Sequence, residues 1–158
     1  MTHDTLTPLS RLAELGIRLP ELSPPLGDYV PAVRSGDLVF TSGQLPLRAG
    51  ALAATGSVGR DVSAAEAADL ARLCTVNALA VLDELVGLDA VARIVKLTGF
   101  VASADGFSGQ SAVINGASAL IGEVFGPAGK HARSAIGVFA LPMGAPVEVE
   151  LIAQLHAG

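Results

Sequence analysis

The chain has 158 residues and a net charge of −5, with 51% hydrophobic, 16% charged and 4% aromatic residues. This length fits one domain with a substantial core. The scattered lysines and arginines and the few aromatic rings argue against a nucleic-acid partner, which requires a basic patch or stacking platforms. The low charged fraction has two explanations: apolar surface covered by another subunit, or an alanine-rich composition from a GC-biased genome.

Cys74 is the only cysteine, so neither an intramolecular disulfide nor a thiolate metal cluster can form. It falls on an apolar helix face and is predicted to be an inert core thiol. The histidines His3, His131 and His156 lack metal-ligand spacing. No basic-then-apolar signal opens the chain, and no apolar run reaches the ~18 residues of a membrane span. We therefore expect a cytoplasmic protein without a metal site or a membrane partner.

Residues 1–26 are predicted to be an N-terminal extension, followed by a single domain over 27–158. The extension would carry a short helix over 10–16, ended by Gly16. The proline-rich stretch 20–25 would then be extended.

The domain is predicted to open with two short strands, at 30–33 and 38–41. A turn over 35–37 would join them as a hairpin. The glycine- and alanine-rich residues 48–60 are typical of a loop.

Two helices and a strand are predicted for the middle of the chain. Ser63 and Glu66 have the spacing of a capping box, so a helix should run from there to about Val86 and end at Gly87. A strand is expected over 91–103. A second helix is expected over 111–124.

The C-terminal part is predicted to hold two strands, over 132–140 and 147–151, the latter alternating with period two. If the intervening turn centres on Gly144, Glu148 pairs with Ala140. The element order, ββαβαββ, predicts an α+β fold with both main helices packed on one face of a mixed sheet. A second subunit is the economical cover for the other face.

Several segments of the chain resemble the Rid (YjgF-like) family in order and spacing. These segments are Gly27–Val33, Phe40–Pro46, Val95–Val101, His131–Ser134 and Leu141–Glu150. The resemblance implies a chorismate-mutase-like fold and a homotrimer with sites between subunits. It also implies hydrolysis of enamines and imines such as 2-aminoacrylate to 2-oxo acids and ammonia, without a cofactor.

The chain also departs from the family pattern, which indicates a divergent subgroup. The family usually has Pro or Ala at His131, a small or basic residue at Phe139, and often Gln at Pro31. The segment 107–115 is longer than usual, and the first 26 residues are additional.

Arg133 and Glu148 are the candidate catalytic residues. A guanidinium binds a carboxylate through two parallel hydrogen bonds, and a 2-imino acid carries its carboxylate beside the carbon that water attacks. The alternative for Arg133 is a salt bridge on the surface or in a trimer. The resemblance gives Glu148 the role of positioning or deprotonating water. The alternative is a solvated carboxylate on the outer face. Glu150, two residues later, would lie on the same face of the strand and competes for the role.

In the expected hairpin, Arg133 lies seven residues from the partner of Glu148, about 23 Å at about 3.3 Å per residue. The two residues could then share a small substrate only across a subunit interface.

Five further residues are candidates for binding the substrate: Tyr29, Ser42, Gly43, Asn115 and Ala135. Tyr29 could donate a hydrogen bond or simply be an amphipathic interface residue. Asn115 could hold substrate or be a cap, and the backbone at Ser42 and Gly43 could approach a ligand or form a tight bend. Ala135 occupies a position that is often Cys in the family, so no thiol chemistry is expected there.

These residues are compatible with three functions. The first is the imine deaminase, whose partner would be a small 2-imino or 2-oxo acid. The second is a trimer that binds small carboxylates without catalysis. The third is an endoribonuclease, a name given to some relatives, against which the acidic charge argues.

Overall fold

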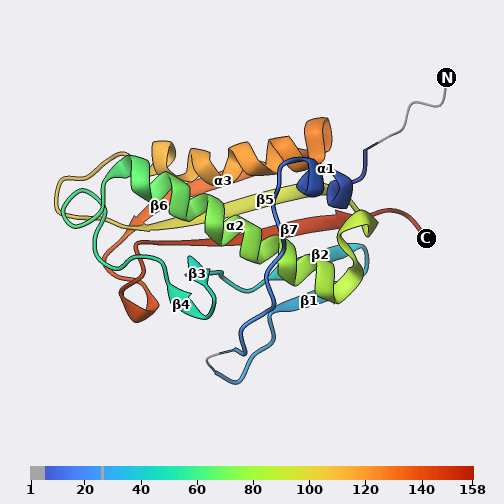
Figure 1. Cartoon of the computed structure of the whole chain (residues 1–158), viewed down its shortest axis with the longest axis horizontal. Coiled ribbons are helices and arrows are strands. Elements are labelled where there is room, and N and C mark those ends of the chain that lie inside the picture. The colour runs from blue at the N-terminus through green and yellow to red at the C-terminus, as the bar shows by residue number, and fades with distance from the viewer. Residues whose placement is uncertain (1–5, 26) are drawn as a thin grey trace.

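The computed structural model describes residues 6–25 and 27–158, which form a five-stranded mixed sheet with two long helices on one face (Figure 1). The strands are β1 (Ala32–Ser35), β2 (Leu38–Thr41), β5 (Val91–Ala102), β6 (Ala132–Val138) and β7 (Val147–Leu155). Their order across the sheet is β1-β2-β7-β5-β6, with only β5 and β6 parallel. The predicted α+β class is confirmed.

The two long helices have the bounds that local signals predict. In α2 (Ala64–Val86) the Ser63 hydroxyl accepts the Glu66 N–H at 3.1 Å, and Gly87 ends the helix with a φ of 78°. The second helix, α3 (Gln110–Phe125), runs beside α2 (Figure 1). At Gly116 of α3 a Cβ would collide with the carbonyl oxygen of Ala68, so glycine permits this close crossing.

The predicted hairpin between the last two strands is wrong, because β5 lies between them. The α3 crossover brings β6 alongside β5 in parallel, and β7 occupies the other side of β5. Every second residue of β7 from Val147 to Leu155 is buried, and both its edges are paired. Alternation correctly gave the buried face of β7, but it does not determine which strands become neighbours.

Three short 3₁₀ turns precede β5, β6 and β7, respectively. These are η1 (Leu88–Ala90), η2 (Gly126–Gly129) and η3 (Pro142–Gly144).

The N-terminal residues pack on the helical side of the sheet. Thr7 caps α1 (Pro8–Glu14), and Leu12 is buried in the core. The chain from 17 to 25 then passes over the outside of α2 on its way to β1 (Figure 1). The predicted short helix is confirmed two residues earlier than expected, and the division of the chain at residue 26 stays a prediction.

A small hairpin interrupts the predicted loop over 48–60. It consists of β3 (Leu47–Arg48) and β4 (Ala51–Leu52), joined by Ala49 and Gly50, which both have positive φ, at 52° and 80°. Two consecutive positive φ values give a type I′ turn, which suits a tight hairpin. Strands of two residues are too short to show alternation in the sequence.

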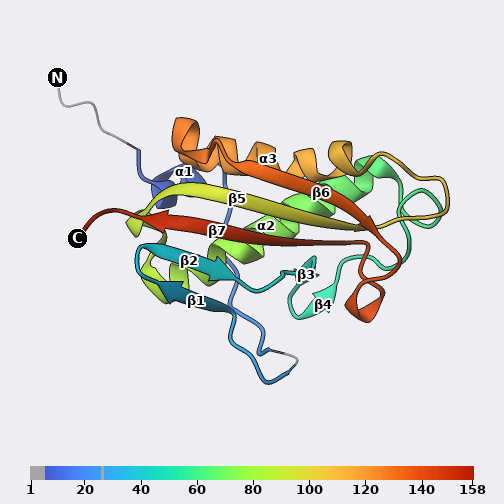
Figure 2. The same ribbon diagram turned by 180° about the vertical axis from the view of Figure 1, so that it is seen from behind.

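The second face of the sheet carries no helix among the described residues (Figure 2). Several large apolar side chains are exposed there, including Val33 at 54%, Phe40 at 40% and Ile136 at 45%. A second subunit that covers this face stays a prediction. In the described part of the chain, no helix is long and apolar enough to cross a membrane.

Candidate functional site

Arg133 projects from β6 toward α3, where three uncharged groups orient its guanidinium. Nη1 donates to Asn115 Oδ1 at 2.8 Å and to Ser118 Oγ at 3.2 Å. Nη2 donates to the Ser111 carbonyl at 3.4 Å. Three of the five guanidinium N–H groups are thus used within the described chain, and Nε–H and one Nη2–H remain.

The Ser118 hydroxyl also contacts His131, which fixes the direction of the hydrogen bonds. His131 Nδ1 lies 2.6 Å from the Gly129 carbonyl, which only accepts, so Nδ1 carries the proton. In the neutral ring, Nε2 then accepts from Ser118 Oγ at 2.9 Å. Ser118 Oγ is therefore oriented with its lone pairs toward Arg133. We call Arg133, Asn115, Ser118 and His131 the Arg133 cluster.

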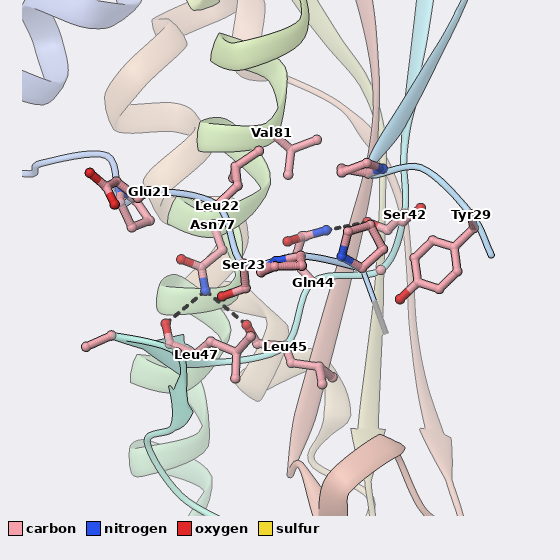
Figure 3. Close-up of a pocket in the computed structure, with 17 residues that line it drawn as sticks. Glu21, Leu22, Ser23, Tyr29, Ser42, Gln44, Leu45, Leu47, Asn77 and Val81 are labelled. Carbon is pink, nitrogen blue, oxygen red and sulfur yellow. Dashed lines mark hydrogen bonds between the residues drawn. The ribbon is translucent and has the colours of Figure 1, made fainter. Parts of the chain in front are cut away.

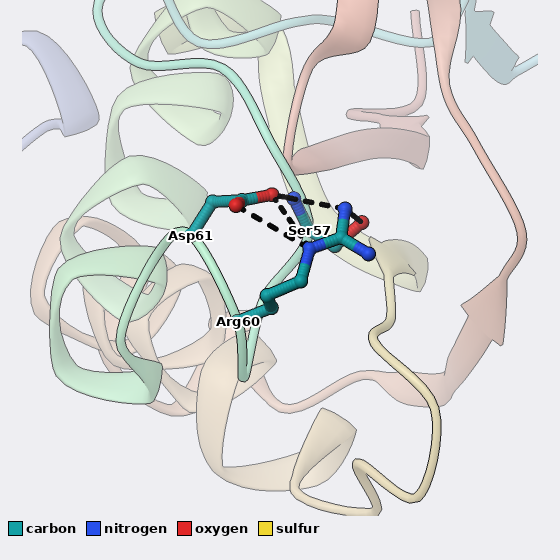
Figure 4. Close-up of polar contacts among 3 residues, drawn as sticks. All are labelled: Ser57, Arg60 and Asp61. Atoms are coloured by element: carbon teal, nitrogen blue, oxygen red, sulfur yellow. Dashed lines mark hydrogen bonds and ion pairs between the residues drawn. The ribbon is translucent and has the colours of Figure 1, made fainter.

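No carboxylate neutralises Arg133 within the described residues. The ion pairs there join Arg60 to Asp61 at 3.1 Å (Figure 4) and Arg72 to Glu123 at 2.9 Å. A salt bridge within the subunit, one alternative for Arg133, is therefore absent from this part of the chain. The arginine presents an oriented and unneutralised charge.

Glu148 belongs to a second group of residues, on the other face of the sheet. Along β7 the residues flanking it, Val147 and Val149, are buried toward the helices, so Glu148 points to the uncovered face. Its carboxylate lies against Gly43, where any Cβ would collide with Glu148 Oε1. Partial burial raises the pKa of the Glu148 carboxyl, and the nearby charge of Glu150 raises it further.

Ser42 and Tyr29 lie beside Gly43. The Ser42 hydroxyl donates to the Val30 carbonyl at 2.7 Å, and its amide donates to the Pro31 carbonyl at 2.7 Å. These bonds hold the segment that carries Tyr29 against the end of β2. Tyr29, Ser42 and Gly43 all line one cavity of about 400 Å³ (Figure 3). We call Tyr29, Ser42, Gly43 and Glu148 the Glu148 cluster.

The two clusters do not meet within one subunit. Arg133 pairs with Leu97 of β5, whereas Glu148 pairs with Phe100. Three residues along β5 and two strand spacings separate their Cα atoms by roughly 14 Å, and the side chains leave opposite faces. The earlier distance of about 23 Å is therefore wrong, because it assumed a β6–β7 hairpin. The inference that one subunit cannot bring the two residues together remains.

The remaining predicted residues divide between the clusters. Asn115 contacts Arg133 directly, and Ala135 follows Arg133 on the same side of β6, packed against the core. Ser118 and His131 were not predicted to contact Arg133. Ser118 lies three residues after Asn115, so helical periodicity could have placed both on one face of α3. No group of three or more metal-binding side chains occurs among the described residues.

A sequence profile described as "YjgF/chorismate_mutase-like, putative endoribonuclease" matches residues 9–155. The chain belongs to this YjgF-like family. The family assignment agrees with the fold, and it covers both clusters.

Individual relatives support the same assignment. A crystal structure of a protein of unknown function from Agrobacterium tumefaciens is 45% identical, with a TM-score of 0.87, covering 96% of this chain and 94% of that one. Protein TCP17 of Trypanosoma cruzi is 42% identical over 93% of both chains. A 2-iminobutanoate/2-iminopropanoate deaminase of Salmonella typhimurium is 35% identical over 81% of this YjgF-like chain and 88% of its own length.

Proposed function

We propose that this protein hydrolyses reactive 2-imino acids, and the enamines that tautomerise to them, to 2-oxo acids and ammonia. The observation that carries the proposal is the uncharged shell around Arg133, which orients the guanidinium without neutralising it. Family membership and the similarity to a relative named as an imine deaminase support the same reaction.

Arg133 would bind the carboxylate beside the reacting carbon. Its two remaining N–H groups can donate two parallel hydrogen bonds to the two oxygens of a carboxylate, a bidentate arrangement. Water then adds to the imine carbon: its oxygen replaces nitrogen in the double bond, its two hydrogens go to nitrogen, and ammonia leaves. Fixing the substrate beside an oriented water supplies most of the acceleration, because imines already react with water.

Glu148 would hold and deprotonate that water. A carboxyl with a raised pKa is a stronger base than an ordinary glutamate, and its ionised form accepts a hydrogen bond from water. Because Arg133 and Glu148 leave opposite faces of one sheet, a second copy must supply one of them. We therefore place the reaction between subunits of a homotrimer whose contacts cover the exposed sheet face, with Tyr29, Ser42, Gly43, Asn115 and Ala135 around the substrate.

Two other functions make different demands on these residues. A carboxylate-binding protein without catalysis would need Arg133 but not Glu148. A ribonuclease would need to attract phosphate, and the net charge of −5 opposes this.

The test is the release of 2-oxo acid from an imine that an amino-acid oxidase generates in place. The wild type should accelerate the release above the uncatalysed rate. Arg133→Ala should abolish both the acceleration and the binding of pyruvate, whereas Glu148→Gln should abolish the acceleration alone. Acceleration that survives in Arg133→Ala would refute the proposed role of the guanidinium.

A further inference from the structure

His131 lies just before β6, and both of its ring nitrogens are engaged. Nδ1 donates to the Gly129 carbonyl at 2.6 Å, and Nε2 accepts from the Ser118 hydroxyl at 2.9 Å. Gly129 is itself packed tightly on α3, because a Cβ at this position would collide with the Ile121 carbonyl oxygen. The imidazole ring is thus held by η2 through one nitrogen and by α3 through the other.

The direction of the Ser118 hydroxyl depends on His131. A hydroxyl has one proton and two lone pairs. When its proton is directed to His131 Nε2, only lone pairs face Arg133, whose Nη1 donates to Ser118 Oγ at 3.2 Å. Without this acceptor, the hydroxyl would donate to a backbone carbonyl of the preceding turn of α3, as serines within helices do. That bond would change the orientation of Oγ relative to Arg133.

The bonds of Nη1 determine how the opposite edge of the guanidinium is presented. The group is planar and rigid. Its plane is therefore fixed by the bonds from Nη1 to Asn115 and Ser118 and by the bond from Nη2 to the Ser111 carbonyl. The donors that remain, Nε–H and one Nη2–H, belong to the two nitrogens of the edge opposite Nη1. A shift of Ser118 Oγ would consequently turn this edge.

We propose that His131 is a positioning residue for carboxylate binding, which acts through Ser118 to fix the orientation of the Arg133 guanidinium. The inference rests on the proposed function, in which Arg133 binds the carboxylate of the substrate. We call the hydrogen bonds from His131 through Ser118 to Arg133 the His131 relay. The family pattern usually has Pro or Ala at position 131, and neither side chain can accept a hydrogen bond from Ser118. The His131 relay is therefore a feature of this chain.

A double-mutant cycle between His131 and Ser118 tests the relay. Isothermal calorimetry should show that His131→Ala binds pyruvate about threefold to fivefold more weakly than the wild type. In the Ser118→Ala background, His131→Ala should have no further effect, because the hydroxyl that His131 orients is absent. If His131→Ala does not fold, His131→Leu removes the same two hydrogen bonds but keeps the bulk, with the same expectation. Independent effects, which multiply in the double variant, would overturn the relay.

A rescue variant separates the hydrogen bonds of His131 from its contribution to packing. The amide of His131→Gln can donate to the Gly129 carbonyl and accept from Ser118, so its affinity should return to within about twofold of the wild type. His156→Ala is the matched control, because His156 is an exposed histidine beyond the end of β7, and it should keep the wild-type affinity.

The outcomes distinguish the relay from the proposed function. Wild-type affinity in His131→Ala, or no recovery in His131→Gln, would overturn the role of His131 but leave the proposed function intact. Failure of the wild type to bind pyruvate would overturn both.

Discussion

Replacing Arg133 with lysine separates charge from geometry at the carboxylate site. The guanidinium uses three donors on Asn115, Ser118 and the Ser111 carbonyl, and two donors remain for a ligand. A lysine ammonium has three donors on one atom. If two of them replace the bonds to Asn115 and Ser118, one is left for the carboxylate.

The ligand would thus lose one of two charge-assisted hydrogen bonds. This loss should cost about 1.5–3 kcal/mol, a roughly tenfold to hundredfold increase in the dissociation constant of pyruvate. Isothermal calorimetry measures the constant directly. Arg72→Lys provides the control, because Arg72 is a partly exposed arginine on α2 whose partner is Glu123. Wild-type affinity in Arg133→Lys would refute the two-pronged carboxylate site.

Four further predictions concern Ser118, Glu148 and the oligomeric state. Ser118→Ala removes one hydrogen bond from Arg133 and the hydroxyl donor to His131. The loss of roughly 1 kcal/mol should weaken pyruvate binding about fivefold. Ser118→Thr keeps a hydroxyl and should restore the affinity; failure to do so would show that the hydroxyl does not orient Arg133. The rate of hydrolysis should decrease as the pH falls through the pKa of Glu148, which is raised above that of an ordinary glutamate. The reason is that only the ionised carboxylate accepts a hydrogen bond from water without donating one. A pH–rate profile that is unchanged in Glu148→Gln would contradict this prediction. The Glu148→Gln variant should also stay folded. Above the pKa that Glu148 has in the unfolded chain, the partly buried ionised carboxylate destabilises the folded state, and glutamine carries no such charge. Light scattering should give three times the chain mass of 15.9 kDa, and a stable monomer at micromolar concentration would exclude the intersubunit site.

The sequence predicted those elements whose signals are local. Ser63 and Gly87 define the ends of α2 through capping and positive φ, and the hydrophobic run from Val91 predicted β5. Strand neighbours were not predictable in the same way, because alternation reports which face of β7 is buried and not whether β6 or β5 lies beside it. The β3–β4 turn was missed because its first residue is Ala49, which rarely adopts positive φ.

In the candidate site, too, chain position could be predicted but contacts that depend on tertiary packing could not. The family resemblance selected Arg133 and Glu148 by their positions in the chain. The contact of Ser118 with both Arg133 and His131 depends on the packing of α3 over β6, which no local pattern specifies. Likewise, the proline-rich composition predicted that residues 20–25 are extended, but not that they enclose a cavity against α2.

The close crossing of α2 and α3 makes the position of the guanidinium depend on a residue that does not touch it. Gly116 lies between Asn115 and Ser118, which both hold Arg133, and it abuts the Ala68 backbone. An alanine at 116 would act as a wedge, lifting this turn of α3 away from α2. Both acceptors of Arg133 would move with that turn. The distance between the two helices thereby determines where the guanidinium of Arg133 lies. Adding one methyl group at the crossing would alter ligand affinity from the opposite side of α3.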